Sequence, residues 1–205
     1  MRWGRIMSPF RRLYRYYNRK RLKNHDFSLI ASNCIGGCIL HDLGLPFNSP
    51  FINLWLKPSD FLKFCVNMDY YLSLNLRFTT VENIHHPVGV LDDILLFFQH
   101  FATEKEAEDA WNRRKKRIRF DNLFVMFTDR DGCTYDDLLR FDKLMIRNKV
   151  VFTHLEYENI VSAFYISGFE KQASVGHLMY FKNKFSYKKY YDAFDYVSWF
   201  NNGIQ

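Results

Sequence analysis

The residues best suited to chemistry lie in one short stretch, where an apolar run gives way to polar residues, a cysteine and two glycines. The run 27–31 is followed by Asn33 and Cys34, and then by Gly36 and Gly37. This order is typical of a buried strand, a tight turn and a short helix, and paired glycines let the backbone approach a ligand closely. A cysteine at the start of a helix lies near the positive end of the helix dipole, which can lower the pKa of a thiol. The stretch therefore predicts an active site with Cys34 as its nucleophile.

A cysteine nucleophile needs a base, and the base needs a group that orients it. Four histidines are candidates for this base: His85, His86, His100 and His154. We expect His100 to accept the proton and Asp92 or Asp93 to orient it, while the Gly36 and Gly37 amides help to stabilise an oxyanion. The alternative is an inert thiol, because free cysteines are among the most buried residues and often only pack.

Two further patterns could bind a metal ion. Asp129-Arg130-Asp131 follows an apolar run, and carboxylates at such a position suit Mg²⁺ or Mn²⁺ bridging to the phosphates of a nucleotide-sugar. The same residues could instead form only a turn before the next helix. Cys34, Cys38 and His41 would share one helix face and could ligate zinc, but no fourth ligand follows at a recognisable spacing. We therefore assign no residue as a metal ligand, and the cofactor stays open, with Mg²⁺ or Mn²⁺ expected only for the Asp129 and Asp131 alternative.

The elements that must position these residues alternate between apolar runs and amphipathic stretches. We expect helices from Ser8 and over 59–73, 103–117, 135–145 and 187–201, and strands over 27–31, 75–81, 94–100, 123–128 and 149–154. The strand–helix–strand order after residue 123 predicts a parallel pair, whose carboxyl ends would present Asp129, Asp131 and His154. The sequence thus predicts a mixed, partly parallel α/β sheet flanked by helices.

Length and composition indicate a single α/β domain over residues 26–205 with a bulky core, since the chain has 205 residues with 21 Phe and 13 Tyr. No apolar run approaches the ~20 residues of a transmembrane helix. We also expect no secretory signal, because the first residues are charged and aromatic. Four cysteines without framework spacing predict reduced thiols in the cytoplasm.

The net charge of +7 comes from the first 25 residues. Of the 29 Lys and Arg, nine lie in residues 1–25, which hold no Asp or Glu, so the rest of the chain has 20 basic and 22 acidic residues and a net charge of −2. Phe10, Leu13, Tyr14 and Tyr17 recur at helical spacing among these cations, which predicts a basic amphipathic extension. Such a helix suits an anionic membrane surface. One alternative is a helix packed on the domain. Another is a helix that binds nucleic acid, but nothing else in the chain is suited to reading bases.

Several motifs occur in a fixed order along the chain: Ser32-Asn33-Cys34-x-Gly36-Gly37, Asp42-Leu43-Gly44-Leu45, Ser49-Pro50-Phe51-Ile52-Asn53-Leu54, Asp60-Phe61-Leu62-Lys63, Pro87-Val88-Gly89-x-Leu91-Asp92-Asp93-Ile94, His100, Trp111-x-Arg113-Arg114-x-x-Arg117-Ile118 and Asp129-Arg130-Asp131-Gly132-Cys133-Thr134. As a set they resemble an uncharacterised bacterial exopolysaccharide-biosynthesis family, catalogued as a domain of unknown function (number nineteen-nineteen). The resemblance spans about residues 27–202, and the cysteine motif is also distantly similar to putative papain-like cysteine peptidases. The resemblance to the exopolysaccharide-biosynthesis family implies an α/β protein that acts on capsule or exopolysaccharide at the cytoplasmic membrane.

These observations together favour a cytoplasmic transferase, peripheral to the inner face of the cell membrane, that moves an acyl or similar group through a Cys34 thiolate. Its partners would be a polysaccharide or lipid-linked glycan precursor and, through residues 1–25, an anionic membrane. Substrate contacts are expected from Asn33, Gly36, Gly37, Asn53, Arg113, Arg114, Asp129 and Asp131. The alternatives are a glycosyl or phosphosugar transferase in which Asp129 and Asp131 use Mg²⁺ or Mn²⁺, and a non-catalytic glycan-binding assembly protein.

Overall fold

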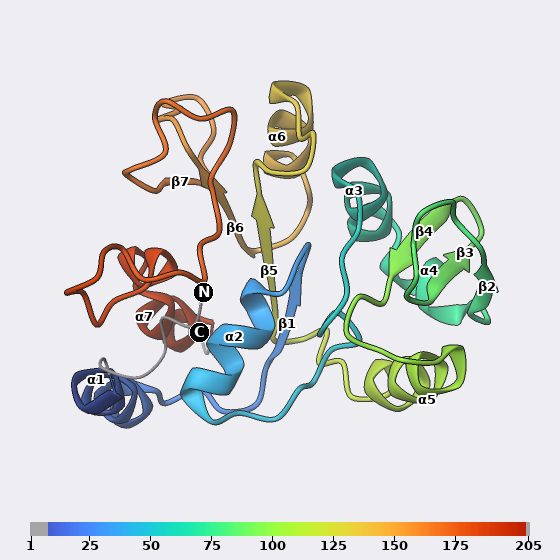
Figure 1. The fold of residues 1–205 in the computed structure, drawn as a ribbon, viewed down its shortest axis with the longest axis horizontal. Helices are drawn as coiled ribbons and strands as arrows, with labels where there is room; N and C mark the ends of the chain where they lie inside the picture. Colours follow the sequence, from blue (N-terminus) through green and yellow to red (C-terminus); the bar gives the residue numbers. More distant parts are fainter. Residues whose placement is uncertain (1–7, 204–205) are drawn as a thin grey trace.

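The computed structural model describes residues 8–203, which form two β-sheets and the helices around them (Figure 1). The strands are β1 (Ser28–Ala31), β2 (Arg77–Thr79), β3 (Val88–Leu91), β4 (Ile94–Phe97), β5 (Leu123–Thr128), β6 (Asn148–Thr153) and β7 (Ala163–Tyr165). The helices are α1 (Ser8–Arg21), α2 (Ile35–Leu43), α3 (Pro58–Val66), α4 (Met68–Ser73), α5 (Glu104–Lys115), α6 (Tyr135–Asp142), the 3₁₀ helix η1 (Tyr190–Ala193) and α7 (Tyr196–Asn202). The predicted mixed α/β class is confirmed.

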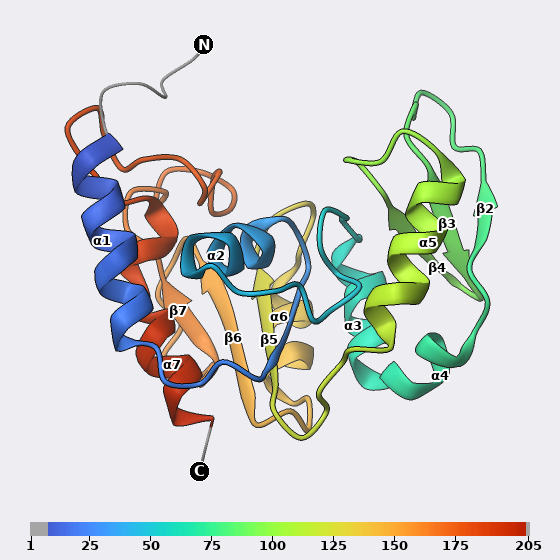
Figure 2. The same ribbon diagram turned by 90° about the horizontal axis from the view of Figure 1, so that it is seen from below.

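The larger sheet is parallel throughout and has the strand order β1-β5-β6-β7. The expected parallel pair is β5 and β6, joined by α6, and the ends of β1 and β5 lie at one edge, since Ala31 pairs with Met126. The smaller sheet is antiparallel, in the order β2-β3-β4. Figure 2 shows α1 and α7 near one end of the molecule and the small sheet with α5 at the other.

Alternating side chains of the parallel strands separate two apolar clusters, one on each face of the larger sheet. Ile30, Val125 and Phe127 belong to the cluster that includes side chains of α3, α5, α6 and the small sheet. Leu29 and Met126 point the other way, into a cluster with side chains of α2 and α7. The period-two alternation of a strand explains why consecutive residues pack into different clusters.

Some expected elements differ from those observed. The helix expected over 59–73 is two helices, because Asn67 leaves helical geometry with φ −137° and ψ 54°, and the first of them begins at Pro58 after Lys57 rather than at a Ser59 cap. The helix expected over 187–201 is likewise divided into η1 and α7, since Phe194 is extended between them and the Asp195 side chain caps α7.

Helix α1 packs on the domain through its polar side. Arg11 is buried and forms ion pairs with Asp42 of α2 and Asp192 of η1, and its Nη2 donates to Tyr191 Oη over 2.9 Å. On the same side, Asn18 donates to Tyr196 Oη over 3.0 Å. The helix is therefore joined to the domain by its cations, which form ion pairs with carboxylates of other segments.

Candidate functional site

Cys34 and His100 are brought together at the edge where β1 ends. The Cys34 Sγ lies 3.5 Å from His100 Nε2, although the two residues are 66 positions apart in the chain. Cys34 directly precedes α2, and His100 follows β4 of the small sheet. The site is thus built from both sheets, and the thiol and imidazole are in hydrogen-bonding contact.

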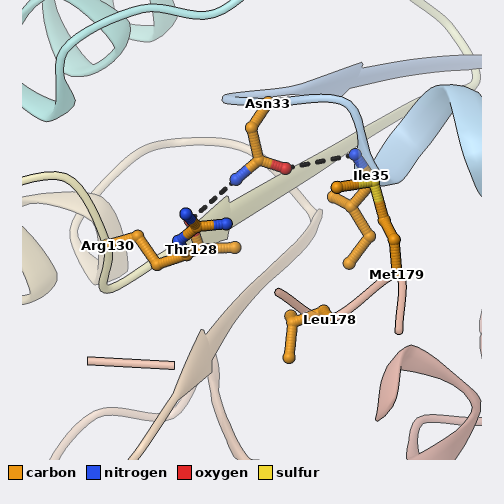
Figure 3. A pocket seen from close by; sticks show the side chains of 6 residues that line it. All are labelled: Asn33, Ile35, Thr128, Arg130, Leu178 and Met179. Atoms are coloured by element: carbon orange, nitrogen blue, oxygen red, sulfur yellow. Dashed lines mark hydrogen bonds between the residues drawn. The ribbon is translucent and has the colours of Figure 1, made fainter. Parts of the chain in front are cut away.

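Asn33 fixes the turn that presents the cysteine. Its Oδ1 accepts the backbone N–H of Ile35 over 3.1 Å, and its Nδ2 donates to Thr128 Oγ1 over 2.9 Å (Figure 3). The side chain therefore ties the start of α2 to the end of β5. Arg130, Leu178 and Met179 complete the small pocket beside it.

The glycines after Cys34 let α2 lie close to β1. A Cβ on Gly36 would lie 2.8 Å from the Cβ of Ala31, whereas a Cβ on Gly37 would meet Ile52 at an ordinary 3.4 Å. Both glycines are buried. Their N–H groups belong to the first turn of the helix, where amides lack an intrahelical acceptor. Gly36 is thus required first for packing, whatever its amide does.

Trp55 joins the two parts of the site. Its backbone exchanges two hydrogen bonds of 2.9 Å with Phe97, the last residue of β4, and its indole packs on the Phe97 ring. Its Nε1 also donates to Asp131 Oδ2 over 3.0 Å. Because Leu56 N–H donates to Ser32 O over 3.4 Å, the segment around Trp55 connects β1 to the strand that precedes His100.

The surroundings of Cys34 disfavour its thiolate. Burial raises its pKa, and the neighbouring Cys38 adds to the rise. The sequence-based expectation of a pKa lowered by the helix dipole is not met, because both of these influences disfavour the thiolate. Any reaction that needs the thiolate therefore needs a proton acceptor in contact with the sulfur, and His100 occupies that position.

The expected orienting acids do not reach His100. Asp92 and Asp93 form the turn between β3 and β4, at the opposite end of β4 from the histidine. Asp92 has φ 52° and accepts the Tyr70 hydroxyl over 2.7 Å, while Asp93 is bound by Lys63 and Tyr71. Both residues stabilise the hairpin and its contact with α3 and α4, so the geometry does not give them the role predicted from the sequence.

Asp129 is engaged within the protein rather than turned to a ligand. Its Oδ2 accepts the backbone N–H and the Nδ1 of His154, over 2.7 and 2.5 Å, and its Oδ1 accepts the N–H of Val175 over 2.7 Å. The carboxylate is buried, and Asp131 is directed instead to Trp55. Across residues 8–203, no cluster of three or more His, Cys, Asp or Glu could hold a metal ion.

The pairing of Asp129 with His154 was not anticipated, although both residues were expected at this edge. The carboxylate contact at Nδ1 holds the imidazole ring in one orientation. The alignment of β5 and β6 brings the two residues together, and no local sequence signal identifies the pair.

The remaining predicted site residues have different positions. Asn53 lies in the loop before α3 in a left-handed conformation, with φ 64°. Arg114 donates to the carbonyl of Ile52 over 3.0 Å, and its guanidinium lies over the Phe47 and Phe101 rings, so it supports the loop and the residue next to His100. Burial, with help from neighbouring arginines, lowers its pKa. Arg113 is exposed.

The zinc interpretation is not supported by the geometry. The His41 side chain is 72% exposed at the end of α2, away from Cys34 at its start. All four cysteines are free, and Cys65 is buried in the core with a raised pKa.

Comparisons with known proteins identify the family of this chain. A Haemophilus influenzae protein described as uncharacterized is 45% identical over 207 residues, which cover 96% of this chain and all of the relative. The family model described as "Domain of unknown function (DUF1919)" matches residues 7–201. The match begins before α1 rather than at residue 27, so the N-terminal helix lies within the region that the family model matches. The chain belongs to the DUF1919 family.

Proposed function

We propose that this protein is a transferase that uses Cys34 as a nucleophile to move an acyl or similar group in the biosynthesis of cell-surface polysaccharide. The main support is the 3.5 Å contact between Cys34 Sγ and His100 Nε2. Further support comes from the position of the pair at the carboxyl end of a parallel strand, where open α/β sheets bind their ligands. The substrate class rests on the motif resemblance to an exopolysaccharide-biosynthesis family.

The proposed reaction has two halves. The Cys34 thiol gives its proton to His100 Nε2, and the sulfur attacks the carbonyl carbon of an ester or thioester donor. A C–S bond forms, the bond to the leaving group breaks, and the leaving group takes the proton from His100. A glycan hydroxyl then attacks the acyl carbon and gives its proton to His100; the C–S bond breaks, and the sulfur recovers the proton. Burial of the thiol makes the contact with His100 essential to the first step.

We also propose that the protein works at the inner face of the cell membrane, where a lipid-linked glycan precursor would be available. Within residues 8–203, no helix is both long and apolar enough to cross a bilayer. Association would be peripheral, through residues 1–25.

Alkylation by iodoacetamide at neutral pH tests the nucleophile. Cys34 should react faster than Cys38, Cys65 or Cys133, and His100→Gln should slow its alkylation about tenfold, since each unit of thiol pKa changes the thiolate fraction tenfold. His85→Gln, at an exposed histidine, is the matched control and should leave the rate unchanged. Equal alkylation of Cys34 in all three proteins would contradict the proposed role of His100.

A genetic test addresses the substrate class. Cys34→Ser should abolish modification of the cell-surface polysaccharide while the protein keeps its melting temperature. Cys38→Ser should retain the modification. An unchanged polysaccharide in cells with the Cys34→Ser protein would exclude the proposed chemistry.

A further inference from the structure

The outward side of α1 is apolar, which is the reverse of an ordinary surface helix. Phe10, Leu13, Tyr16 and Tyr17 are exposed by 65, 64, 61 and 59%, while Arg11 and Asn18 on the other side are buried. Surface helices normally turn their apolar side to the core. Here the core side is satisfied by ion pairs and hydrogen bonds with Asp42, Asp192 and Tyr196, so the aromatic side remains free.

A second segment with the same character lies next to α1. Residues 181–189 form a hairpin, with Phe181 bridged to Lys189 and Lys182 N–H donating to Lys188 O over 3.1 Å. Phe185 lies in its turn and is 82% exposed, with the Lys184 ammonium over its ring.

Direct contacts join the hairpin to the helix. The rings of Tyr14 and Tyr187 lie 5.7 Å apart between centroids, and the Lys188 ammonium lies over the Tyr14 ring. Arg11 Nη1 donates to the carbonyl of Tyr187 over 3.3 Å. Figure 2 shows the hairpin beside the N-terminal end of α1, and both figures place the two at the same end of the molecule (Figures 1 and 2). We call this combined area the α1–hairpin surface; it comprises Phe10, Leu13, Tyr16, Tyr17, Lys20, Lys184, Phe185 and Lys188.

The charge of this surface has one sign. Residues 8–25 and 171–191 contain no Asp or Glu. Among the described residues, Lys20, Lys184 and Lys188 form no ion pair, in contrast to Arg11, Arg15 and Arg21, whose carboxylate partners lie on the domain. The surface therefore offers unpaired cations between exposed aromatic and aliphatic side chains.

This combination matches an anionic lipid surface. Aromatic and leucine side chains enter the boundary between head groups and acyl chains, and the ammonium groups lie at the depth of the phosphates. We propose that the α1–hairpin surface is the part of the protein that binds an anionic bilayer, with the Phe185 turn as a second inserting element besides α1. This inference deepens the proposed membrane location and rests on it.

Sedimentation with vesicles tests the inference on the full chain. Vesicles of phosphatidylglycerol and phosphatidylcholine should retain the protein, and vesicles of phosphatidylcholine alone should retain it weakly. Lys184→Ala should lower the partition coefficient about fivefold, as expected for one cation near an anionic surface. Phe185→Ser should also lower the partition coefficient, and should do so even at a salt concentration that screens the charges, because the contribution of the Phe185 side chain is apolar. Val161→Ser, at a residue 93% exposed outside the surface, is the matched control and should bind normally.

Three outcomes would overturn the inference. These are equal retention by both kinds of vesicle, equal binding by the Phe185→Ser and Val161→Ser proteins, and a dimer in sedimentation velocity that Phe185→Ser abolishes while vesicles bind nothing. The last would assign the surface to a second copy of the chain. Alkylation of Cys34 in the Phe185→Ser protein separates this test from that of the proposed chemistry, because its rate should equal that of the wild type.

Discussion

Replacing Arg11 with methionine should destabilise the protein strongly, although Arg11 belongs to a terminal helix. The guanidinium is 9% exposed as a side chain and lies between the carboxylates of Asp42 and Asp192, which are 7% and 0% exposed. Removing one partner of a buried ion pair costs about 3–5 kcal/mol, because a buried charge is left uncompensated. For a protein of this size, that cost corresponds to a fall in melting temperature of about 6–20 °C.

The pH dependence of this loss has a defined sign. In the wild type, burial opposes ionisation of Asp42, but the Tyr191 hydrogen bond and the Arg11 charge outweigh it and lower its pKa. For Asp192, burial outweighs Arg11 and raises the pKa. Without Arg11, both pKa values should rise above those of the unfolded chain. The resulting penalty exists while the carboxylates are ionised and is lost as pH falls through their folded-state pKa values.

Urea denaturation at several pH values measures this effect. The difference in free energy of unfolding between wild type and Arg11→Met should be largest at neutral pH and should shrink toward about pH 4, near the ordinary pKa of an aspartate. Arg12→Met makes the same change at an exposed neighbour and should cost less than about 0.5 kcal/mol. The reasoning would be refuted if the two variants had equal stability, or if the Arg11→Met difference were independent of pH.

Two pairs of substitutions test the packing of α2 and the cap of α6. Gly36→Ala should lower the free energy of unfolding by about 1–3 kcal/mol in urea denaturation, because the new Cβ would lie 2.8 Å from that of Ala31. Gly37→Ala is the control and should be tolerated. Similar stabilities of the two variants would contradict the packing argument. Thr134→Ala should cost about 1 kcal/mol in the same measurement, since the hydroxyl accepts the Asp137 N–H over 3.2 Å at the start of α6. Thr134→Ser should keep this cap. An alanine variant as stable as the wild type would show that the cap contributes nothing.

The sequence predicted the elements whose patterns are long and regular. The continuous apolar run of β5 and the caps of α5 are local signals, and both elements formed close to the expected bounds. Strand β7 was missed because it has three half-buried residues and its place in the sheet depends on pairing with β6. The break at Asn67 was missed because the apolar spacing continues across it.

The candidate site was predictable in its residue types but only partly in its geometry. Cys34 and His100 were paired from their chemistry, and they do meet in the structure. Asp92 and Asp93 do not have the orienting position expected of them, because they form the hairpin turn before β4 and His100 follows its other end. The burial of Arg11 was equally hidden, since its partners Asp42 and Asp192 come from segments far away in the chain.

The association of the first helix with the last has a consequence for how the protein is made. Asn18 contacts Tyr196, Arg21 pairs with Asp195, and the backbone N–H of Lys23 donates to Asn201 Oδ1 over 2.8 Å. Strand β1 likewise cannot pair until β5 has been translated, about a hundred residues later. During synthesis on the ribosome, α1 therefore emerges long before its partners in η1 and α7, although Asp42 of α2 follows it closely. Until these last segments are released, the polar side of α1 lacks its partners Asp192 and Tyr196, and the incomplete domain is exposed to aggregation.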